Sequence, residues 1–419
     1  MARRPAGRKA WTVLVYLAGD NNLDPSGIAD LLEMKRVGTT PQLNVVAEFD
    51  RASGRGAKRY VLRKGGSLAD DAVASLGRVN TGDPAQLLDF VRWGVTSHPA
   101  ERYALVLWNH GQGWDDTDIY AGARRRRFRR LATGRIRHAL FRPPVRRVLR
   151  SAVRKFEARA ILLDDDAKDF LDNVEMKRVL ASAAELIGAK LDVLGMDACL
   201  MSMAEVGYQV RESARFTVGS EQTEPGDGWP YDRVLAALAK HPEMDAGDLS
   251  ATIVKAYLAS YAAADGVTQS ACDLARAEDL AAAVAGLARA LTAALPEPAV
   301  RQRILAARAR VQSYEVPDNV DLVDLCRLLA AGMPKSAVAQ RCGDVLRAVG
   351  KDGAAARGGA AGGYVVAGGW KGAGLGRSHG VAIYFPTTAV SPLYPRLDWA
   401  KATGWDRFLA AYLRAVRGR

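Results

Sequence analysis

Cysteine is scarce in this chain of 419 residues, and its placement excludes several kinds of site. The 4 cysteines form no Cys-x-x-Cys pair and show no spacing with histidine that matches a zinc site. Their pattern favours a reducing compartment. Cys272, Cys326 and Cys342 fall in helical patterns and are expected to pack in the core, which leaves Cys199 to be explained.

Long apolar runs are also lacking. No stretch reaches the roughly 18 apolar residues that a membrane-spanning helix needs. The basic N-terminus is followed by "WTVLVYLAG", which superficially matches a signal peptide, but the run is short and no small-residue cleavage site follows. The next residues, "GDNN", predict a turn. We therefore expect a first core strand here and a cytoplasmic protein, with export left open.

Acidic residues are almost absent from one segment. Residues 121–160 contain 14 Arg, 1 Lys and 1 Glu, a local net charge of +14, whereas the whole chain carries +13. The remainder is therefore close to neutral. A run this basic repels itself and is expected to be exposed. The basicity belongs to this Arg-rich insert and says little about the folded body.

The rest of the chain has the pattern of an α/β protein. Short runs of Val, Leu and aromatic residues, bounded by Gly, Asp or Asn, predict buried strands of a mostly parallel sheet, and helical patterns between them place helices on both faces. The predicted strands are Trp11–Leu17, Leu43–Phe49, Tyr103–Trp108, Leu191–Met196, Phe216–Gly219 and Gly380–Phe385, and the predicted helices include Leu23–Val37, Pro84–Thr96 and Val174–Leu186.

We expect three regions. Residues 1–230 form the α/β core and carry the insert, and residues 231–350 are mostly helical. Residues 351–419 contain a Gly-rich loop or hairpin, a further core strand and a C-terminal helix. The Gly-rich stretch lacks the Gly-Lys-Ser/Thr ending of a phosphate-binding loop.

Two predicted strands end in residues suited to catalysis. "YALVLW" is followed by "NHGQGW" with His110, and "LDVLGM" is followed by "DACLM" with Cys199. Loops that follow parallel strands meet at one edge of the sheet. An imidazole there can lower the pKa of a thiol or act as its base, and the backbone N–H groups of Gly111 and Cys199 can stabilise an oxyanion. On pattern alone, a packing role for both residues remains equally open.

Five blocks resemble the clostripain family of cysteine peptidases, relatives of caspases and gingipains. In order along the chain they are "VLVYLAGDNNLD", "LVLWNHGQGW", "GMDACLMSMAEV", "VGSEQTEPGDGWPY" and "HGVAIYFP". The resemblance implies a caspase-like α/β/α sandwich with a mostly parallel central sheet, a largely helical C-terminal region, and a Cys-His dyad in which Cys199 is the nucleophile and His110 its partner.

The resemblance also explains Asp197, two residues before Cys199. It matches the family aspartate in the pocket for the residue that precedes the scissile bond. A carboxylate there selects Arg through a two-pronged pair, with Lys as the second choice. The implied substrates are peptides or proteins cleaved after Arg or Lys. Capping of the following helix is the structural alternative for Asp197.

The Arg-rich insert admits three interpretations. An enzyme selective for Arg would find its own processing site there, as relatives are cut between their His-bearing and Cys-bearing parts. Alternatively, the insert binds nucleic acid or an anionic membrane, although its few aromatics give little support for base stacking. It can also be a solvated loop without a role. A catalytically silent relative that uses the insert as a binding arm is the rival to an active peptidase.

No cofactor is required by this chemistry, and no metal site is assigned. Some clostripain relatives depend on calcium, and "LLDDDAKDFLDN" gathers carboxylates without matching an EF-hand loop, so a solvated acidic turn is the alternative. Glu221, Glu224 and Asp227 are expected to line the substrate cleft in unassigned roles. The sequence leaves the oligomeric state open. The acidic residues of the turn are Asp164, Asp165, Asp166, Asp169 and Asp172.

Overall fold

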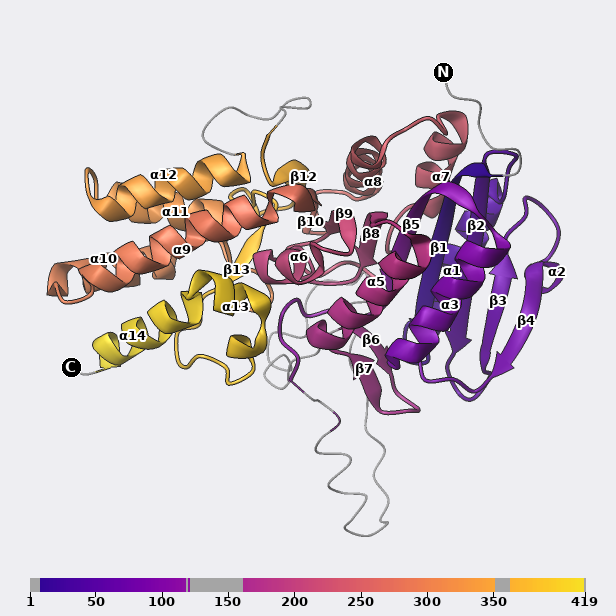
Figure 1. Ribbon diagram of the computed structural model, residues 1–419, viewed down its shortest axis with the longest axis horizontal. Helices are drawn as coiled ribbons and strands as arrows, with labels where there is room; N and C mark the ends of the chain where they lie inside the picture. The colour runs from indigo at the N-terminus through magenta and orange to yellow at the C-terminus, as the bar shows by residue number, and fades with distance from the viewer. Residues whose placement is uncertain (1–7, 118–119, 121–160, 351–361, 418–419) are drawn as a thin grey trace, which may run out of the picture.

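A nine-stranded sheet organises the molecule (Figure 1). The computed structural model describes residues 8–117, 120, 161–350 and 362–417. In spatial order the strands are β12 (Val365–Lys371), β10 (Val267–Asp273), β9 (Ala214–Gly219), β8 (Leu191–Asp197), β5 (Ala100–Trp108), β1 (Lys9–Gly19), β2 (Leu43–Arg51), β3 (Ala57–Val61) and β4 (Ala72–Gly77).

The middle of the sheet is parallel and its two edges are antiparallel. β9, β8, β5, β1 and β2 run in one direction, while β3 and β4 on one side and β10 and β12 on the other pair antiparallel. The five parallel strands therefore end at a common edge, and the loops after them gather there.

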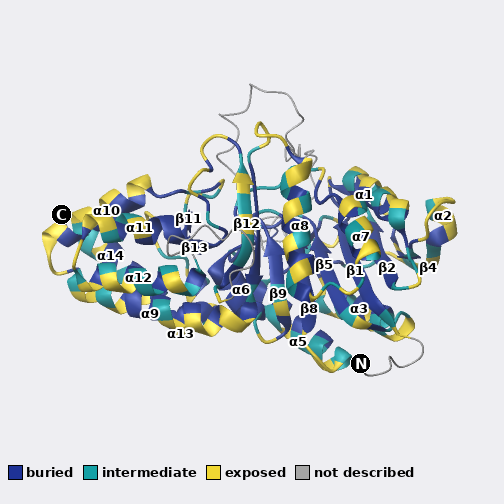
Figure 2. Ribbon diagram, turned by 90° about the horizontal axis from the view of Figure 1, so that it is seen from above, coloured by how far each residue is buried: buried dark blue, intermediate teal, exposed yellow. Residues whose placement is uncertain are grey.

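Both faces of the parallel strands are buried, which explains their unbroken apolar sequences. In β1, Leu14 and Tyr16 pack into one hydrophobic cluster, and Val13 and Val15 pack into the other. Figure 2 shows α1, α7 and α8 over one face and α3 and α5 over the opposite face. The covering helices are α1 (Asp24–Val37), α7 (Tyr231–Lys240), α8 (Ala246–Ser260), α3 (Pro84–Ser97), α5 (Asn173–Ile187) and α6 (Ala204–Val210).

A group of helices packs beside the sheet and is drawn from orange to yellow in Figure 1. Its longest member, α9 (Ala277–Ala294), contacts α12, α13 and α14. The apolar residues Leu280, Val284, Leu287 and Leu291 of α9 are buried. The others are α10 (Pro298–Arg310), α11 (Leu322–Gly332), α12 (Ala337–Val349), α13 (Asp398–Thr403) and α14 (Trp405–Arg417).

Two small sheets and three short helical segments complete the described structure. β6 (Ile161–Asp164) pairs with β7 (Asp169–Leu171), and β11 (Asn319–Asp321) pairs with β13 (Ala382–Tyr384). The short segments are α2 (Leu68–Asp71), η2 (Leu274–Arg276) and η3 (Tyr394–Arg396). None of the helices in the described ranges has the length and apolarity to cross a bilayer.

The predicted strands and helices are confirmed in position, with corrections at the C-terminal side. β10 interrupts the expected helical region and joins the central sheet, so Cys272 is buried in a strand and not in a helix. The predicted strand Gly380–Phe385 exists as β13 but pairs with β11, outside the central sheet. Within the Gly-rich stretch, residues 365–371 form β12, the sheet edge; residues 351–361 lie outside the described residues.

Candidate active site

The loops after β5 and β8 start side by side. The parallel register pairs Trp108 with Asp197, the last residue of each strand. His110 and Cys199 each follow two residues later. The expectation that both lie at the same edge of the sheet is therefore met by the register itself, although they are 89 positions apart in the chain.

Glycine brings the two loops into direct contact. A Cβ atom on Gly111 would lie 2.5 Å from the carbonyl oxygen of Cys199 and 2.9 Å from the Cβ atom of Ala198. Only glycine fits so close to the backbone of the Cys199 loop. Leu200, directly after the cysteine, has a φ of 64°, a left-handed conformation that costs a side-chain-bearing residue free energy and that is found at functional turns.

The Cys199 thiol is partly buried and sits against the loop after β9. The backbone N–H of Glu224 donates to Sγ at 3.2 Å. Burial is the main reason why the pKa of Cys199 rises to about 11, and the nearby carboxylate of Asp197 adds to the rise. The resting thiol is thus protonated at neutral pH. Cys199 is half-buried, whereas Cys272, Cys326 and Cys342 are buried.

Two buried asparagine side chains hold the histidine loop, and sequence reasoning missed both. The amides of Asn21 and Asn109 each donate to the carbonyl oxygens of Ala18 and Leu163, which ties the ends of β1 and β5 to β6. Asn22 and His110 directly follow these two asparagines in the chain. Their side chains meet, because His110 Nε2 lies 3.0 Å from Asn22 Oδ1. The signal was present in "GDNN", interpreted only as a turn, and in "WNH", where only His110 was assigned a role.

Asp197 is buried beneath the cysteine loop. Its Oδ2 accepts hydrogen bonds from the Trp229 backbone N–H at 3.2 Å and from the Tyr231 hydroxyl at 2.8 Å. Gly228 approaches the same carboxyl with a φ of 57°. Burial raises the pKa of Asp197, although these hydrogen bonds act in the opposite direction. The donors to Oδ2 thus belong to the loop after β9 and to the start of α7. Neither of these two hydrogen bonds comes from α6, the helix after Cys199.

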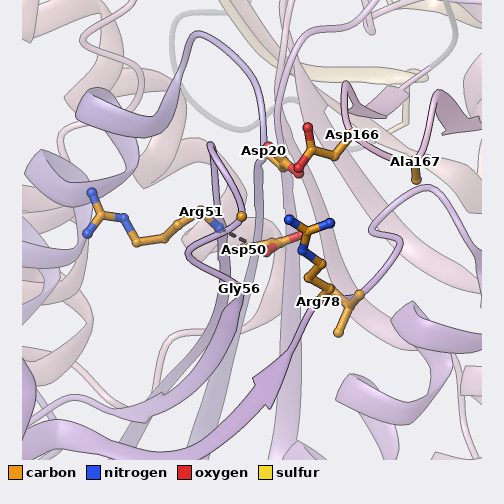
Figure 3. A pocket seen from close by; sticks show the side chains of 9 residues that line it. Asp20, Asp50, Arg51, Gly56, Arg78, Asp166 and Ala167 are labelled. Carbon is orange, nitrogen blue, oxygen red and sulfur yellow. Dashed lines mark hydrogen bonds between the residues drawn. The ribbon is translucent and has the colours of Figure 1, made fainter.

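A second acidic group lies farther along the same sheet edge. The carboxyl groups of Asp20, Asp50 and Asp164 are buried and offer ligand atoms within 4.8 Å of one another. Asp20 and Asp50 line a pocket of about 190 Å³, in which Arg78 points toward Asp50 and the carboxyls of Asp20 and Asp166 approach each other (Figure 3). Burial, then repulsion among the carboxyls, raises the pKa of Asp20 to about 7 and that of Asp50 to about 8.

The acidic turn predicted as a possible calcium loop is dispersed by the structure. Asp165 accepts from the Tyr120 hydroxyl, Asp169 accepts from Asn80, and Asp172 caps α5. Of the five, Asp164 alone belongs to the three-carboxylate group, where it also accepts from Thr81. Closeness in the sequence therefore did not predict this group, because its three carboxyl groups come from three separate strand ends.

The Arg-rich insert, residues 121–160, lies outside the described residues. The chain enters the described structure again at Ile161, which forms a bridge with Gly111 of the histidine loop. The segment that follows the insert is therefore part of the site.

The raised pKa of Cys199 predicts slow alkylation at neutral pH. Only the thiolate reacts with iodoacetamide, and roughly one thiol in 10,000 is ionised at pH 7 when its pKa is about 11. We expect the alkylation rate at Cys199 to rise about tenfold per pH unit between pH 7 and 10. Cys199→Ala protein, whose other thiols are buried, provides the background rate. A rate that is already at its plateau at pH 7 would instead indicate a thiolate paired with imidazolium.

Three comparisons with known proteins agree with this architecture. Clostripain of Hathewaya histolytica is 27% identical over 253 residues, which cover 54% of this chain but only 41% of that protein. A secreted C11 cysteine protease from Bacteroides thetaiotaomicron, solved with an irreversible peptide inhibitor, superimposes with a TM-score of 0.64 at 19% identity, over 95% of this chain and 100% of its own.

An inactive zymogen of a C11 protease from Parabacteroides distasonis gives a TM-score of 0.66 at 18% identity, covering 95% and 99% of the two chains. At such identities the likeness shows the fold alone, and it confirms the caspase-like α/β fold expected from the sequence. The model of the clostripain family matches residues 15–129 and 150–340. With more than half of its length matched, this chain belongs to the clostripain family.

Proposed function

We propose that the protein is a cysteine endopeptidase that cleaves after Arg, with Lys as the second choice. The observation that carries the proposal is the meeting of the Cys199 and His110 loops at one sheet edge, above a buried carboxylate two residues before the thiol. Membership in the clostripain family supports the same chemistry. Peptide or protein substrates are the partners that this site implies.

The reaction starts from a protonated thiol. Because the pKa of Cys199 is about 11, a base must take its proton as Sγ attacks the carbonyl carbon of the substrate. His110, held by the loop that Asn109 anchors, is that base and then gives the proton to the leaving amine. An acyl-enzyme forms, and water hydrolyses it with His110 again moving the proton.

The negative charge that develops on the carbonyl oxygen requires nearby donors. The backbone N–H groups of Cys199 and Gly111 are the donors we assign, since the absent side chain of Gly111 lets its backbone lie against the cysteine loop. Removal of one such donor in other enzymes costs about 100-fold to 1,000-fold in kcat.

A peptide panel tests the nucleophile and the pocket together. Fluorogenic peptides with Arg, Lys, Asp or Ala before the reporter should be hydrolysed in the order Arg, then Lys, with Asp and Ala at background. Cys199→Ala should abolish turnover. Asp197→Asn should lower kcat/KM for the Arg peptide by about 30-fold or more, because it removes one partner of a buried charge pair.

Asp192→Asn is the matched control for this panel. Asp192 lies at the other end of β8 and pairs with Arg215, so its loss should leave the Arg-to-Lys preference unchanged. Absence of turnover for every peptide, even after nicking of the insert with trypsin and addition of calcium, would favour a catalytically silent relative. Salt-sensitive binding of nucleic acid or anionic vesicles that is lost when residues 121–160 are deleted would then identify the binding arm.

We further propose that the enzyme processes itself within the Arg-rich insert. The insert supplies 14 Arg between the segment that carries His110 and the segment that carries Cys199. The first described residue after the insert is Ile161, which bridges Gly111 of the histidine loop, and this connection supports the proposal.

Self-processing predicts a dependence on the nucleophile. Wild-type protein should separate into two fragments on a denaturing gel, whereas Cys199→Ala protein should remain one chain of about 45 kDa because it cannot cut the insert. Appearance of the same two fragments in Cys199→Ala protein would assign the cuts to a host protease.

Calcium has a better-suited set of ligands than the sequence indicated. We propose Asp20, Asp50 and Asp164 as that set, because calcium prefers several oxygen ligands and would relieve the repulsion among these carboxyls. The ion would contribute charge neutralisation at the sheet edge that carries the histidine loop. Arg78, which points toward Asp50, would compete with it (Figure 3).

Calcium should therefore raise the Tm of the wild type, by on the order of 2–4 °C, and a chelator should reverse the shift. The shift should be larger at pH 8 than at pH 6, because protons compete for carboxyls whose pKa values are about 7 and 8. Asp50→Asn should remove the shift, and Asp89→Asn, an exposed carboxylate that pairs with Arg59, should retain it. An equal shift in Asp50→Asn would rule out this set.

A further inference from the structure

A buried carboxyl group on α1 lies close to the proposed specificity aspartate and has no assigned role. Asp30 is 2% exposed and faces the sheet. The Trp108 indole donates a hydrogen bond to its carboxyl, while its Oδ2 is shielded from solvent and has no hydrogen-bond partner among the described residues. After burial, the charge of Asp197 contributes most to raising the pKa of Asp30, which places the two carboxyls near each other.

Glu224 adds a third carboxyl group to the same place. Its Oε1 accepts from the Gln269 amide at 3.3 Å, its Oε2 is shielded from solvent and has no hydrogen-bond partner among the described residues, and after burial the charge of Asp197 contributes most to raising its pKa. The backbone N–H of Glu224 contacts the Cys199 thiol. The residue that carries the third carboxyl therefore also contacts the nucleophile, through its backbone.

No ion pair to Asp30, Asp197 or Glu224 occurs in the described parts of the chain. By contrast, the buried carboxylate of Glu48 pairs with Arg59 at 2.8 Å, and that of Asp71 pairs with Lys35. Buried carboxyls without a cation lose hydration without compensation. This is the arrangement expected when the cation arrives with the substrate.

The surrounding side chains favour a flat cation. Tyr257 is fully buried, its hydroxyl has no hydrogen-bond partner among the described residues, and Glu224 exerts the strongest charge effect on it. Tyr261 packs against Tyr257 with ring centroids 4.9 Å apart and donates to the Gly228 carbonyl. A guanidinium is planar, stacks on aromatic rings and offers five N–H donors, whereas an ammonium offers three.

We propose that Asp30 and Glu224 complete, with Asp197, the floor of the pocket for the residue before the scissile bond, and that they make the pocket prefer a guanidinium to an ammonium. Asp197 supplies the negative charge that pairs with the guanidinium. Asp30 Oδ2, which has no partner among the described residues, accepts a hydrogen bond from a guanidinium N–H that a Lys ammonium does not reach. This inference rests on the proposed cleavage after basic residues and assigns the residues that separate Arg from Lys.

The test uses the full chain with Asp30→Asn and Glu224→Gln, each a near-isosteric change. Peptides carry Arg, Lys or citrulline, an uncharged analogue of Arg, before the reporter. Asp30→Asn should lower kcat/KM for the Arg peptide by about tenfold or more, mainly through KM, and should lower it less for the Lys peptide. Glu224→Gln should also reduce the Arg-to-Lys ratio. The ratio for Arg over citrulline should fall in both.

Asp232→Asn serves as the matched control. Asp232 pairs with Arg36 between α1 and α7 but belongs to no part of the pocket, so its loss should leave all ratios unchanged. A general loss of stability would lower activity on every peptide equally and would not change the Arg-to-Lys ratio. Unchanged ratios in both Asp30→Asn and Glu224→Gln, with a wild type that cleaves after Arg, would overturn this inference alone.

A binding measurement separates the pocket from the proposed activity. N-acetylarginine amide should slow the alkylation of Cys199 by iodoacetamide in wild-type protein and should protect Asp30→Asn protein much less. If this pattern appears while no peptide is cleaved, the peptidase proposal fails and the pocket stands. If the wild type shows neither cleavage nor protection, both fail.

Discussion

The arrangement of the site depends on two buried amide groups that satisfy backbone oxygens at the end of the sheet. Asn21 and Asn109 each donate to the carbonyls of Ala18 and Leu163. A buried carbonyl without a donor costs on the order of 1–3 kcal/mol, so these bonds fix the ends of β1, β5 and β6 relative to one another. The same hydrogen bonds position Asn22 and His110, which directly follow Asn21 and Asn109 in the chain.

Burial then shifts the ionisation of the site. The same loss of hydration raises the pKa of the Cys199 thiol and of the Asp197 carboxyl, and it is the largest contribution to both shifts. A basic side chain that entered the proposed pocket would oppose these shifts, because it would supply a countercharge that no ion pair among the described residues gives to Asp197. Binding of such a side chain would then be linked to the ionisation of the site, since both occur in the same region of low dielectric constant.

The parallel strands could be predicted because burial on both faces leaves an unbroken apolar sequence. The antiparallel edges could not. β4 alternates between partly and fully exposed residues, and β12 is rich in glycine. In β10, buried polar residues interrupt the apolar pattern that would predict a strand. The hydroxyls of Thr268 and Ser270 form hydrogen bonds with those of Ser220 and Ser202 from distant segments. Such long-range partners leave no local pattern.

The same reasoning explains what was found and missed in the site. Cys199, His110 and Asp197 stand at strand ends, where the direction of parallel strands predicts their convergence. Asp30 lies inside a helix whose sequence gives no sign that the carboxyl faces inward. The group of Asp20, Asp50 and Asp164 comes from three separate strand ends: the pairing of β1 with β2 brings Asp20 and Asp50 together, and Asp164 comes from β6, outside the central sheet.

The register between β5 and β8 has a consequence for the chain as a whole. Residues 121–160 lie in the connection between these neighbouring strands, which pair from Ala104–Val193 to Trp108–Asp197 in the middle of the sheet. A break anywhere in that connection would turn the molecule into a heterodimer whose subunit interface is its own hydrophobic core. The two pieces would stay associated as firmly as the domain stays folded, and neither would hold a complete site when alone.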